Sequence, residues 1–266
     1  MLKENATSVA DLLATSLRLR NEWFPEERTW RTWFRGHINA DWPLCPKIFR
    51  LQSAARPIRV IEDEIRQEFT MRAPGFSGGR ITDPWEGYFT MQHYGAPTRL
   101  LDWTEGALIG LYFATRDHVP PADAAVWILD PYWLNQQVVG EREVVAPAAR
   151  AGILESYVER YQPWLPPRYS ETELNPMPVA IYPTYTARRI STQRSCFTIH
   201  GADPAGLDKL FSRRDAHVAR VVVPARAVPQ IKAELSIAGI DETAIFPDLD
   251  GLGRFLNNLF DEEREE

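Results

Sequence analysis

The spacing of apolar residues along the chain predicts a series of amphipathic helices. The predicted helices cover residues 7–20, 57–72, 84–94, 105–116, 226–238 and 249–260. Thr7 or Ser8 can cap the first helix, and Pro84 suits the first turn of the third. Thr104 and Asp248 stand where the N-caps of the fourth and the last helix are expected.

Short runs of apolar and β-branched residues predict strands between these helices. The predicted strands cover residues 29–35, 98–103, 124–129, 196–200 and 217–223. Residues 131–187 carry many prolines and aromatics, which favour short helices and ordered loops. With no internal repeat and no low-complexity linker, the pattern predicts one compact α+β domain.

Composition places the chain among soluble globular proteins. Of the 266 residues, 44% are hydrophobic and 25% are charged, which excludes collagenous and disordered classes. No stretch is long and apolar enough for a membrane helix, and residues 1–20 lack the features of a secretory signal. Cys45 and Cys196 are far apart, so we expect buried thiols in a reducing compartment, the cytoplasm.

Charge and motifs narrow the function classes further. A net charge of −6 argues against a general nucleic-acid coat, although a local basic site stays possible. The sequence contains no phosphate-binding loop, no G-x-G-x-x-G, no zinc-binding spacing and no nucleophile elbow. These absences disfavour the well-marked hydrolases, nucleotide folds and metalloenzymes, and we expect no metal.

The first candidate cluster is Phe34-Arg35-Gly36-His37, at the end of a predicted strand. A guanidinium at this position can donate hydrogen bonds to two phosphate or ribose oxygens at once, and the glycine lets the backbone approach a ligand. The alternative interpretation is a buried arginine paired with a carboxylate.

The second cluster lies within residues 91–104, which combine many polar side chains with an apolar pair. Its polar and aromatic members are Gln92, His93, Tyr94, Thr98, Arg99, Asp102, Trp103 and Thr104. An arginine and an aspartate beside two leucines need internal partners, so an Arg99–Asp102 structural pair is the alternative to a binding role. A histidine in the position of His93 is more often a helix-end residue with satisfied hydrogen bonds than a catalyst.

The last two clusters are basic and acidic. Arg188, Arg189 and Arg194 surround Gln193, either as a binding loop or as a solvated one. The two aspartates of residues 246–251 favour turn formation and helix capping over cation binding.

Four blocks in this order resemble the FRG domain family. They are FRG (34–36) followed by KIFR (47–50), the segment 92–115, the segment 189–200 and the segment 246–256. The resemblance spans residues 28–256, with departures at Ala96 and at 105–106. It implies domain limits of 28–260 after an N-terminal helical segment (1–27) and before an acidic tail (261–266). Members occur in bacterial and phage-related settings, which implies a toxin or defence role.

The order of these blocks is similar to that of ADP-ribosyltransferases, an analogy at the level of the fold. The analogy implies a small split mixed sheet flanked by helices, with NAD as the substrate. Arg35, Gly36 and His37 would hold the dinucleotide, and Gln193 would accept a hydrogen bond from the ribose. Because a glutamine cannot act as a base, Asp102 or His93 would activate the acceptor.

The remaining residues of the second cluster would contribute to cofactor binding. Tyr94 or Trp103 would stack on the nicotinamide. Thr98, Arg99 and Thr104 complete the expected cofactor set.

Three hypotheses remain open from the sequence. The first is an NAD-consuming ADP-ribosyltransferase acting on an intracellular protein or nucleic acid, with an antitoxin or inhibitor as a further partner. The second is a binding module for a nucleotide or nucleic acid that performs no turnover. The third is a structural protein in which all four blocks serve the fold.

Overall fold

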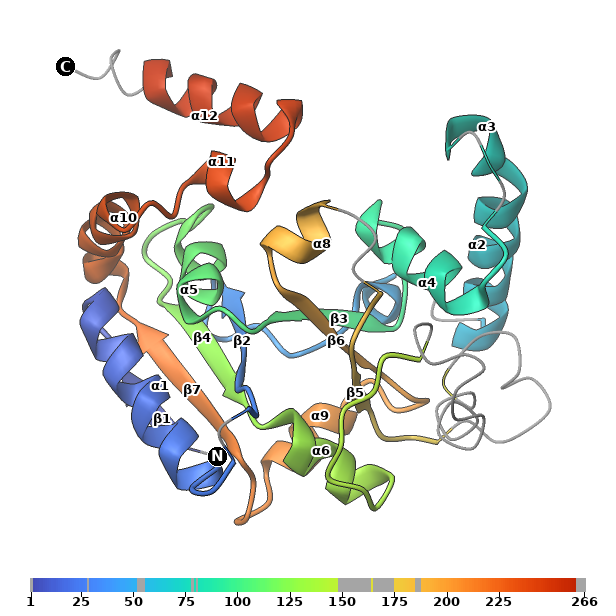
Figure 1. Cartoon of the computed structure of the whole chain (residues 1–266), viewed down its shortest axis with the longest axis horizontal. Helices are drawn as coiled ribbons and strands as arrows, with labels where there is room; N and C mark the ends of the chain where they lie inside the picture. Colours follow the sequence, from blue (N-terminus) through green and yellow to red (C-terminus); the bar gives the residue numbers. More distant parts are fainter. Residues whose placement is uncertain are drawn as a thin grey trace.

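A computed structural model of the chain describes most of its length (Figure 1). The described residues are 2–27, 29–51, 56–77, 79, 81–147, 164, 175–184 and 188–261. Statements below on what the structure contains refer to these ranges.

The described strands form one mixed seven-stranded sheet in the order β1-β7-β4-β2-β3-β6-β5. The strands are β1 (Leu2–Asn5), β2 (Trp33–His37), β3 (Leu100–Thr104), β4 (Ala124–Leu129), β5 (Val179–Ile181), β6 (Ser195–Ile199) and β7 (Val218–Val223). β1 runs parallel to β7, and the other neighbours are antiparallel. The predicted α+β class and the mixed sheet are therefore confirmed.

The six predicted helices lie close to their expected positions, as α1 (Val9–Trp23), α2 (Ile58–Arg72), α4 (Pro84–His93), α5 (Ala107–Thr115), α10 (Val228–Ile237) and α12 (Leu249–Asp261). The shorter helices α3 (Pro74–Ser77), α6 (Pro131–Val138), α8 (Arg188–Thr192), α9 (Gly206–Phe211) and α11 (Glu242–Ile245), and the 3₁₀ turns η1 (Lys47–Arg50) and η4 (Ala225–Ala227), had no predicted bounds. Ser8 forms a capping box with Asp11 at α1, and Asp248 accepts from the Gly251 N–H at α12. Capping side chains satisfy the free N–H groups of a first turn, which explains these helix starts.

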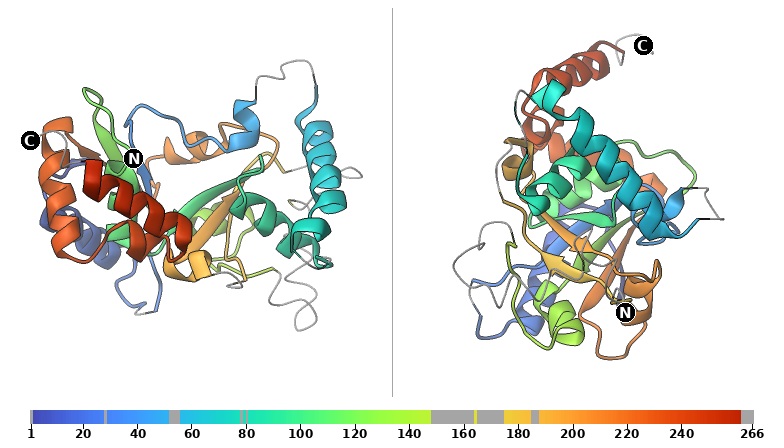
Figure 2. Two further views of the ribbon diagram at one scale, coloured as in Figure 1. Left: turned by 90° about the horizontal axis from the view of Figure 1, so that it is seen from above. Right: turned by 90° about the vertical axis from the view of Figure 1, so that its right-hand side faces the viewer.

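Helices cover both faces of the sheet (Figures 1 and 2). One apolar core joins α1, α5 and α10 to β2, β4 and β7, with Leu19, Leu111, Val126 and Ile231 among its buried members. A second core lies on the opposite face, between the sheet and α6 and α9, and is rich in tryptophan. A third packs α4 against β3, β5 and β6.

Glycines let α5 pack unusually close to β2. A Cβ atom on Gly36 would lie 2.2 Å from the Gly110 carbonyl oxygen and 2.3 Å from the Ala114 nitrogen. A Cβ on Gly110 would lie 2.8 Å from the Cβ of Phe34. Since backbone atoms cannot move aside cheaply, the glycine of the FRG block is required by helix packing.

β2 and β3 diverge almost as soon as they meet. β2 pairs with β4 from Trp33 to His37, but with β3 only at Phe34↔Thr104. β3 in turn pairs with β6 over its whole length. The sheet therefore opens between β2 and β3, beyond the residue pair that joins them.

Several elements differ from the prediction. The strand expected at 29–35 lies at Trp33–His37, and β1 and β5 were not predicted. Both are short edge strands, so their apolar runs are too brief to be distinctive. The segment 1–27 thus contributes a strand of the sheet as well as helix α1. Among the described helices, none has the length and apolar character needed to span a bilayer.

Candidate functional site

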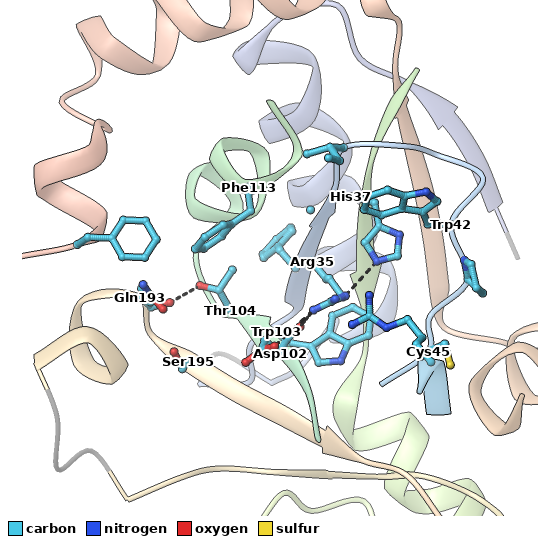
Figure 3. A pocket seen from close by; sticks show the side chains of 16 residues that line it. Arg35, His37, Trp42, Cys45, Asp102, Trp103, Thr104, Phe113, Gln193 and Ser195 are labelled. Carbon is cyan, nitrogen blue, oxygen red and sulfur yellow. Dashed lines mark hydrogen bonds and ion pairs between the residues drawn. The ribbon is translucent and has the colours of Figure 1, made fainter. Parts of the chain in front are cut away.

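A pocket of about 540 Å³ lies where β2 and β3 diverge (Figure 3). This volume is in the range of pockets that hold nucleotide-sized ligands. Four structural units line it. They are β2 with the segment that follows it (Phe34–Ile38, Trp42, Pro43, Cys45, Arg50), β3 (Asp102, Trp103, Thr104), the start of β6 (Gln193, Ser195), and a pair of phenylalanines (Phe113, Phe246).

Arg35 crosses the opening between the two strands. Its Nε donates to His37 Nε2 at 3.0 Å, and its Nη1 donates to the Asp102 carbonyl oxygen at 2.6 Å. The same Nη1 lies 3.9 Å from the Asp102 carboxylate. Burial lowers the pKa of Arg35, and the nearby Arg50 lowers it further, whereas Asp102 opposes both. Arg35 therefore links β2 to β3 at the pocket floor.

His37 is neutral at physiological pH. Burial, and after it the charge of Arg35, lowers the pKa of His37 to about 3. Because Nε2 accepts from Arg35, the neutral ring carries its proton on Nδ1. The imidazole thus acts as a hydrogen-bond acceptor that fixes the Arg35 side chain, and it carries no charge of its own.

Asp102 is the one acidic residue in the described part of the pocket lining. Its side chain is 59% exposed, and its Oδ2 accepts from Gln92 Nε2 at 2.9 Å. Gln92 Oε1 in turn accepts from the Thr98 hydroxyl. Gln92 and Thr98 therefore act through Asp102: they orient its carboxylate while leaving it open to solvent.

Thr104 and Gln193 meet on the other side of the pocket. The Thr104 hydroxyl donates to the Gln193 carbonyl oxygen at 2.6 Å and accepts from the Gly106 N–H at 3.0 Å. Thr104 is thus the last residue of β3, and Gly106 holds the N-cap position of α5 that was predicted for Thr104. The Gln193 side-chain amide donates to the Ile245 carbonyl oxygen at 3.3 Å, so the hydrogen bond engages its nitrogen and not its oxygen.

Arg99 lies outside the pocket, and the predicted Arg99–Asp102 pair does not form. Arg99 and Glu62 are both fully buried, and Arg99 Nε lies 2.8 Å from Glu62 Oε2. The other guanidinium nitrogens donate to the carbonyls of His200 and Trp164. The Tyr88 hydroxyl contacts Glu62 and accepts from the Arg99 N–H. Asp102 pairs instead with Arg35, because Arg99 points into the core beside α2 and α4.

Three further predicted residues also lie away from the pocket. His93 and Tyr94 end α4 and line a separate small hollow beside Ile190. Tyr94 is 75% exposed and does not line the pocket between β2 and β3. Thr98 is fully buried and reaches the pocket only through Gln92. The side chains of Arg188 and Arg189 lie outside the described residues, so the predicted basic cluster is described only at Arg194.

Trp103 lines the pocket but mainly serves the core. It is 3% exposed, and its indole N–H donates to the Thr198 hydroxyl at 3.1 Å. Trp42, by contrast, is 48% exposed at the pocket and lies 6.5 Å from the His37 ring. Trp42 is therefore the better placed of the two indoles to contact a flat ligand.

Sequence reasoning missed eight of the residues that line the pocket: Ile38, Trp42, Pro43, Cys45, Arg50, Phe113, Ser195 and Phe246. The sequence did single out the region of Arg50, since this residue ends the KIFR block (47–50). It also singled out the region of Phe246, since this residue opens the block at 246–256, but nothing local in the sequence indicated that this block reaches the pocket of Arg35. There Phe246 packs 6.1 Å from Phe113 and under the guanidinium groups of Arg116 and Arg254.

Metal chemistry finds no support in the described residues, which contain no cluster of three histidine, cysteine or carboxylate side chains suited to a metal. The polar groups of the described pocket lining include two guanidiniums, one carboxylate, one amide, one imidazole, one thiol and two hydroxyls. Such a set suits an anionic ligand with sugar-like hydroxyls.

Comparison with known proteins gives one match. Residues 30–122 match the family model described as FRG domain. The predicted resemblance is confirmed over this segment, which contains the FRG and KIFR blocks and the block at 92–115. No curated protein and no solved structure gives a significant match.

Proposed function

We propose, from the premise that residues 30–122 form an FRG domain, that the chain is an NAD-dependent ADP-ribosyltransferase. Its acceptor would be a macromolecule, either protein or nucleic acid. The observation that carries the proposal is the opening of the sheet between β2 and β3, with Arg35 on one side and Gln193 on the other.

The order of elements supports this assignment. The first strand carries Arg35, the second leads directly into α5, and the third begins just after Gln193. The second and third strands are hydrogen-bonded neighbours, and the first diverges from them around the pocket. This is the arrangement expected of a split sheet that clamps a dinucleotide, and the finer fold assignment remains part of the proposal.

The pocket supplies groups that the reaction needs. The bond between nicotinamide nitrogen and ribose C1 breaks, and its electron pair leaves with the neutral nicotinamide. Positive charge then develops on the ribose and is quenched when an acceptor oxygen or nitrogen bonds to C1. Asp102 is the carboxylate placed to take the acceptor's proton, and Gln193 can orient a ribose hydroxyl.

The test is nicotinamide release from NAD in the presence of cell lysate, followed by chromatography. Wild-type protein should release nicotinamide, and Arg35→Ala should lose at least about 100-fold in rate while it stays folded by circular dichroism. Asp102→Asn should lose rate with little change in NAD affinity. Absence of release by folded wild-type protein with lysate present would overturn the proposal.

One observation favours the second candidate, a binding module without turnover. Among the described residues, Asp102 is the sole carboxylate that lines the pocket, and no described glutamate lines it. A binding module would bind NAD or a related nucleotide saturably and return it unchanged. Recovery of intact ligand after long incubation with lysate would favour this function over the transferase.

A further inference from the structure

The phosphate-binding role expected of Arg35 conflicts with its contacts. A guanidinium grips two anionic oxygens best through a pair of neighbouring nitrogens. Arg35 Nε is engaged by His37, and Nη1 by the Asp102 carbonyl. Only Nη2 lacks a partner among the described residues. Arg35 can therefore add one hydrogen bond to a ligand, but it cannot offer an unoccupied Nε–Nη edge.

Arg50 has the freedom that Arg35 lacks. It lines the same pocket and is exposed, and it makes no hydrogen bond or ion pair with any residue that the structure describes. Its charge is near enough to lower the pKa of both Arg35 and His37. An unpaired cation beside a buried cation repels it, so this arrangement is more favourable when an anion lies between them.

The backbone of Arg50 is fixed by the fold. Arg50 ends η1, where Ile48 is fully buried and its N–H donates to the Thr98 carbonyl at 3.3 Å. Lys47 Nζ donates to the Gly95 carbonyl at 2.6 Å. These contacts join η1 to the turn that precedes β3. The turn thus serves the pocket indirectly, by holding the element that carries Arg50.

We propose that Arg50 is the main anion-binding side chain of this pocket, and that its ligand carries a diphosphate. Two guanidiniums line the pocket from separate elements. Arg50 can offer all its N–H groups to a ligand, whereas Arg35 can offer those of Nη2. Two guanidiniums on separate elements can each bind one phosphate group, so they suit a diphosphate better than a single phosphate. The exposed face of Trp42, on the same connecting segment, is available to an aromatic base.

Arg35 then has a positioning role, because it holds β2 and β3 together at the floor of the pocket. The inference rests on the proposed function only in its choice of ligand class, since NAD contains a diphosphate. It concerns binding, so it can be tested without turnover.

The experiment is calorimetric titration of the full chain with ADP, AMP and inorganic pyrophosphate. Wild-type protein should bind ADP and pyrophosphate more tightly than AMP, with affinity that falls as salt rises. Arg50→Ala should weaken ADP and pyrophosphate binding about 10- to 100-fold, and Arg50→Lys should restore part of it. The matched control is Arg226→Ala in η4, an exposed arginine outside the pocket, which should leave binding unchanged.

Each failure has a distinct meaning. Unchanged ADP binding by Arg50→Ala would overturn the role of Arg50, and equal affinity for ADP and AMP would overturn the diphosphate class. No binding of ADP or pyrophosphate by wild-type protein would overturn the whole inference. Nicotinamide release is measured on the same preparations. ADP binding that depends on Arg50, without any release from NAD, would overturn the transferase function and leave this inference intact.

Discussion

Arg35 lies within β2 and Arg99 directly precedes β3, and both have apolar and polar neighbours in the sequence. In the structure their surroundings differ sharply. Arg99 is fully buried and bonded to Glu62 and to two backbone carbonyls. Arg35 keeps 19% of its side chain exposed and faces a pocket.

The difference shows what separates a structural arginine from one at a ligand site. A buried cation must have all its donors satisfied within the protein, because unpaired burial costs several kcal/mol. Arg99 meets this requirement through Glu62, the core carbonyls and the support of Tyr88. The carboxylate partner of Arg35 is Asp102, which lies 3.9 Å from Arg35 Nη1 and is itself mostly exposed. Partner geometry, and not local sequence, therefore distinguishes the two roles.

The largest expected effect comes from breaking the buried pair. Glu62→Ala leaves Arg99 without its counter-charge in the core, so the free energy of unfolding should fall by about 3–5 kcal/mol. Asp102→Ala removes an exposed partner of Arg35 and should cost less than about 1 kcal/mol. Urea denaturation followed by fluorescence measures both. Equal losses in the two variants would refute the distinction between the two arginines.

A smaller but still large effect is expected at the glycine contact beside Arg35. Gly36→Ala forces a methyl group against the backbone of α5 and should lower the free energy of unfolding by about 3 kcal/mol. Gly253→Ala in α12 is the matched control, since no heavy atom lies within 4 Å of its added Cβ. That variant should gain about 0.5–1 kcal/mol from helix propensity. A harmless Gly36→Ala would mean that α5 does not pack on β2 as closely as described.

The smallest expected effect concerns His200, which lies beside Arg99 as His37 lies beside Arg35. Burial, and after it the charges of Arg99 and Arg35, lowers the pKa of His200 to about 3. Between about pH 6.5 and pH 3, the His200 imidazole is therefore protonated in the unfolded chain and neutral in the folded protein. The stability contributed by the neutral ring is complete above pH 6.5 and is lost as the pH falls.

The corresponding measurement compares denaturation near pH 6.5 and pH 5. His200→Leu removes the titrating group, and no described residue bonds to either ring nitrogen, so the change leaves no described partner unsatisfied. The loss of stability between the two pH values should shrink by about 2 kcal/mol, at about 1.4 kcal/mol per pH unit for one proton. An identical pH slope in wild type and variant would show that His200 does not carry this dependence.

Much of the fold was predictable because its signals are local. The strand at 124–129 and the helices at 57–72 and 84–94 match within two residues, since apolar period, proline and caps act over a single turn or strand. The strand order was not predictable in this way. β1 pairs with β7 more than 200 residues later, and no local pattern encodes that partner.

The candidate site was predictable in part. Arg35, Asp102, Thr104 and Gln193 do line one pocket, together with Gly36, His37 and Trp103. His93, Tyr94, Thr98 and Arg99 do not, although they belong to the same sequence block. A block that contains both a helix end and a strand sends its side chains in different directions, so proximity in sequence was a poor guide there.

The sequence by itself determined the approximate positions of the longer helices and the central strands, which segments are apolar, and that an FRG block precedes a strand–helix unit. Only the tertiary structure decided which polar side chain meets a ligand. Glu62, 37 positions earlier in the chain, binds the Arg99 guanidinium in the core, so Arg99 cannot contact a ligand in the pocket. Phe246, from the C-terminal region, forms part of the pocket wall. The physical reason is that caps and periodicity arise between neighbours, whereas charge pairing and cavity walls arise between residues that only folding brings together.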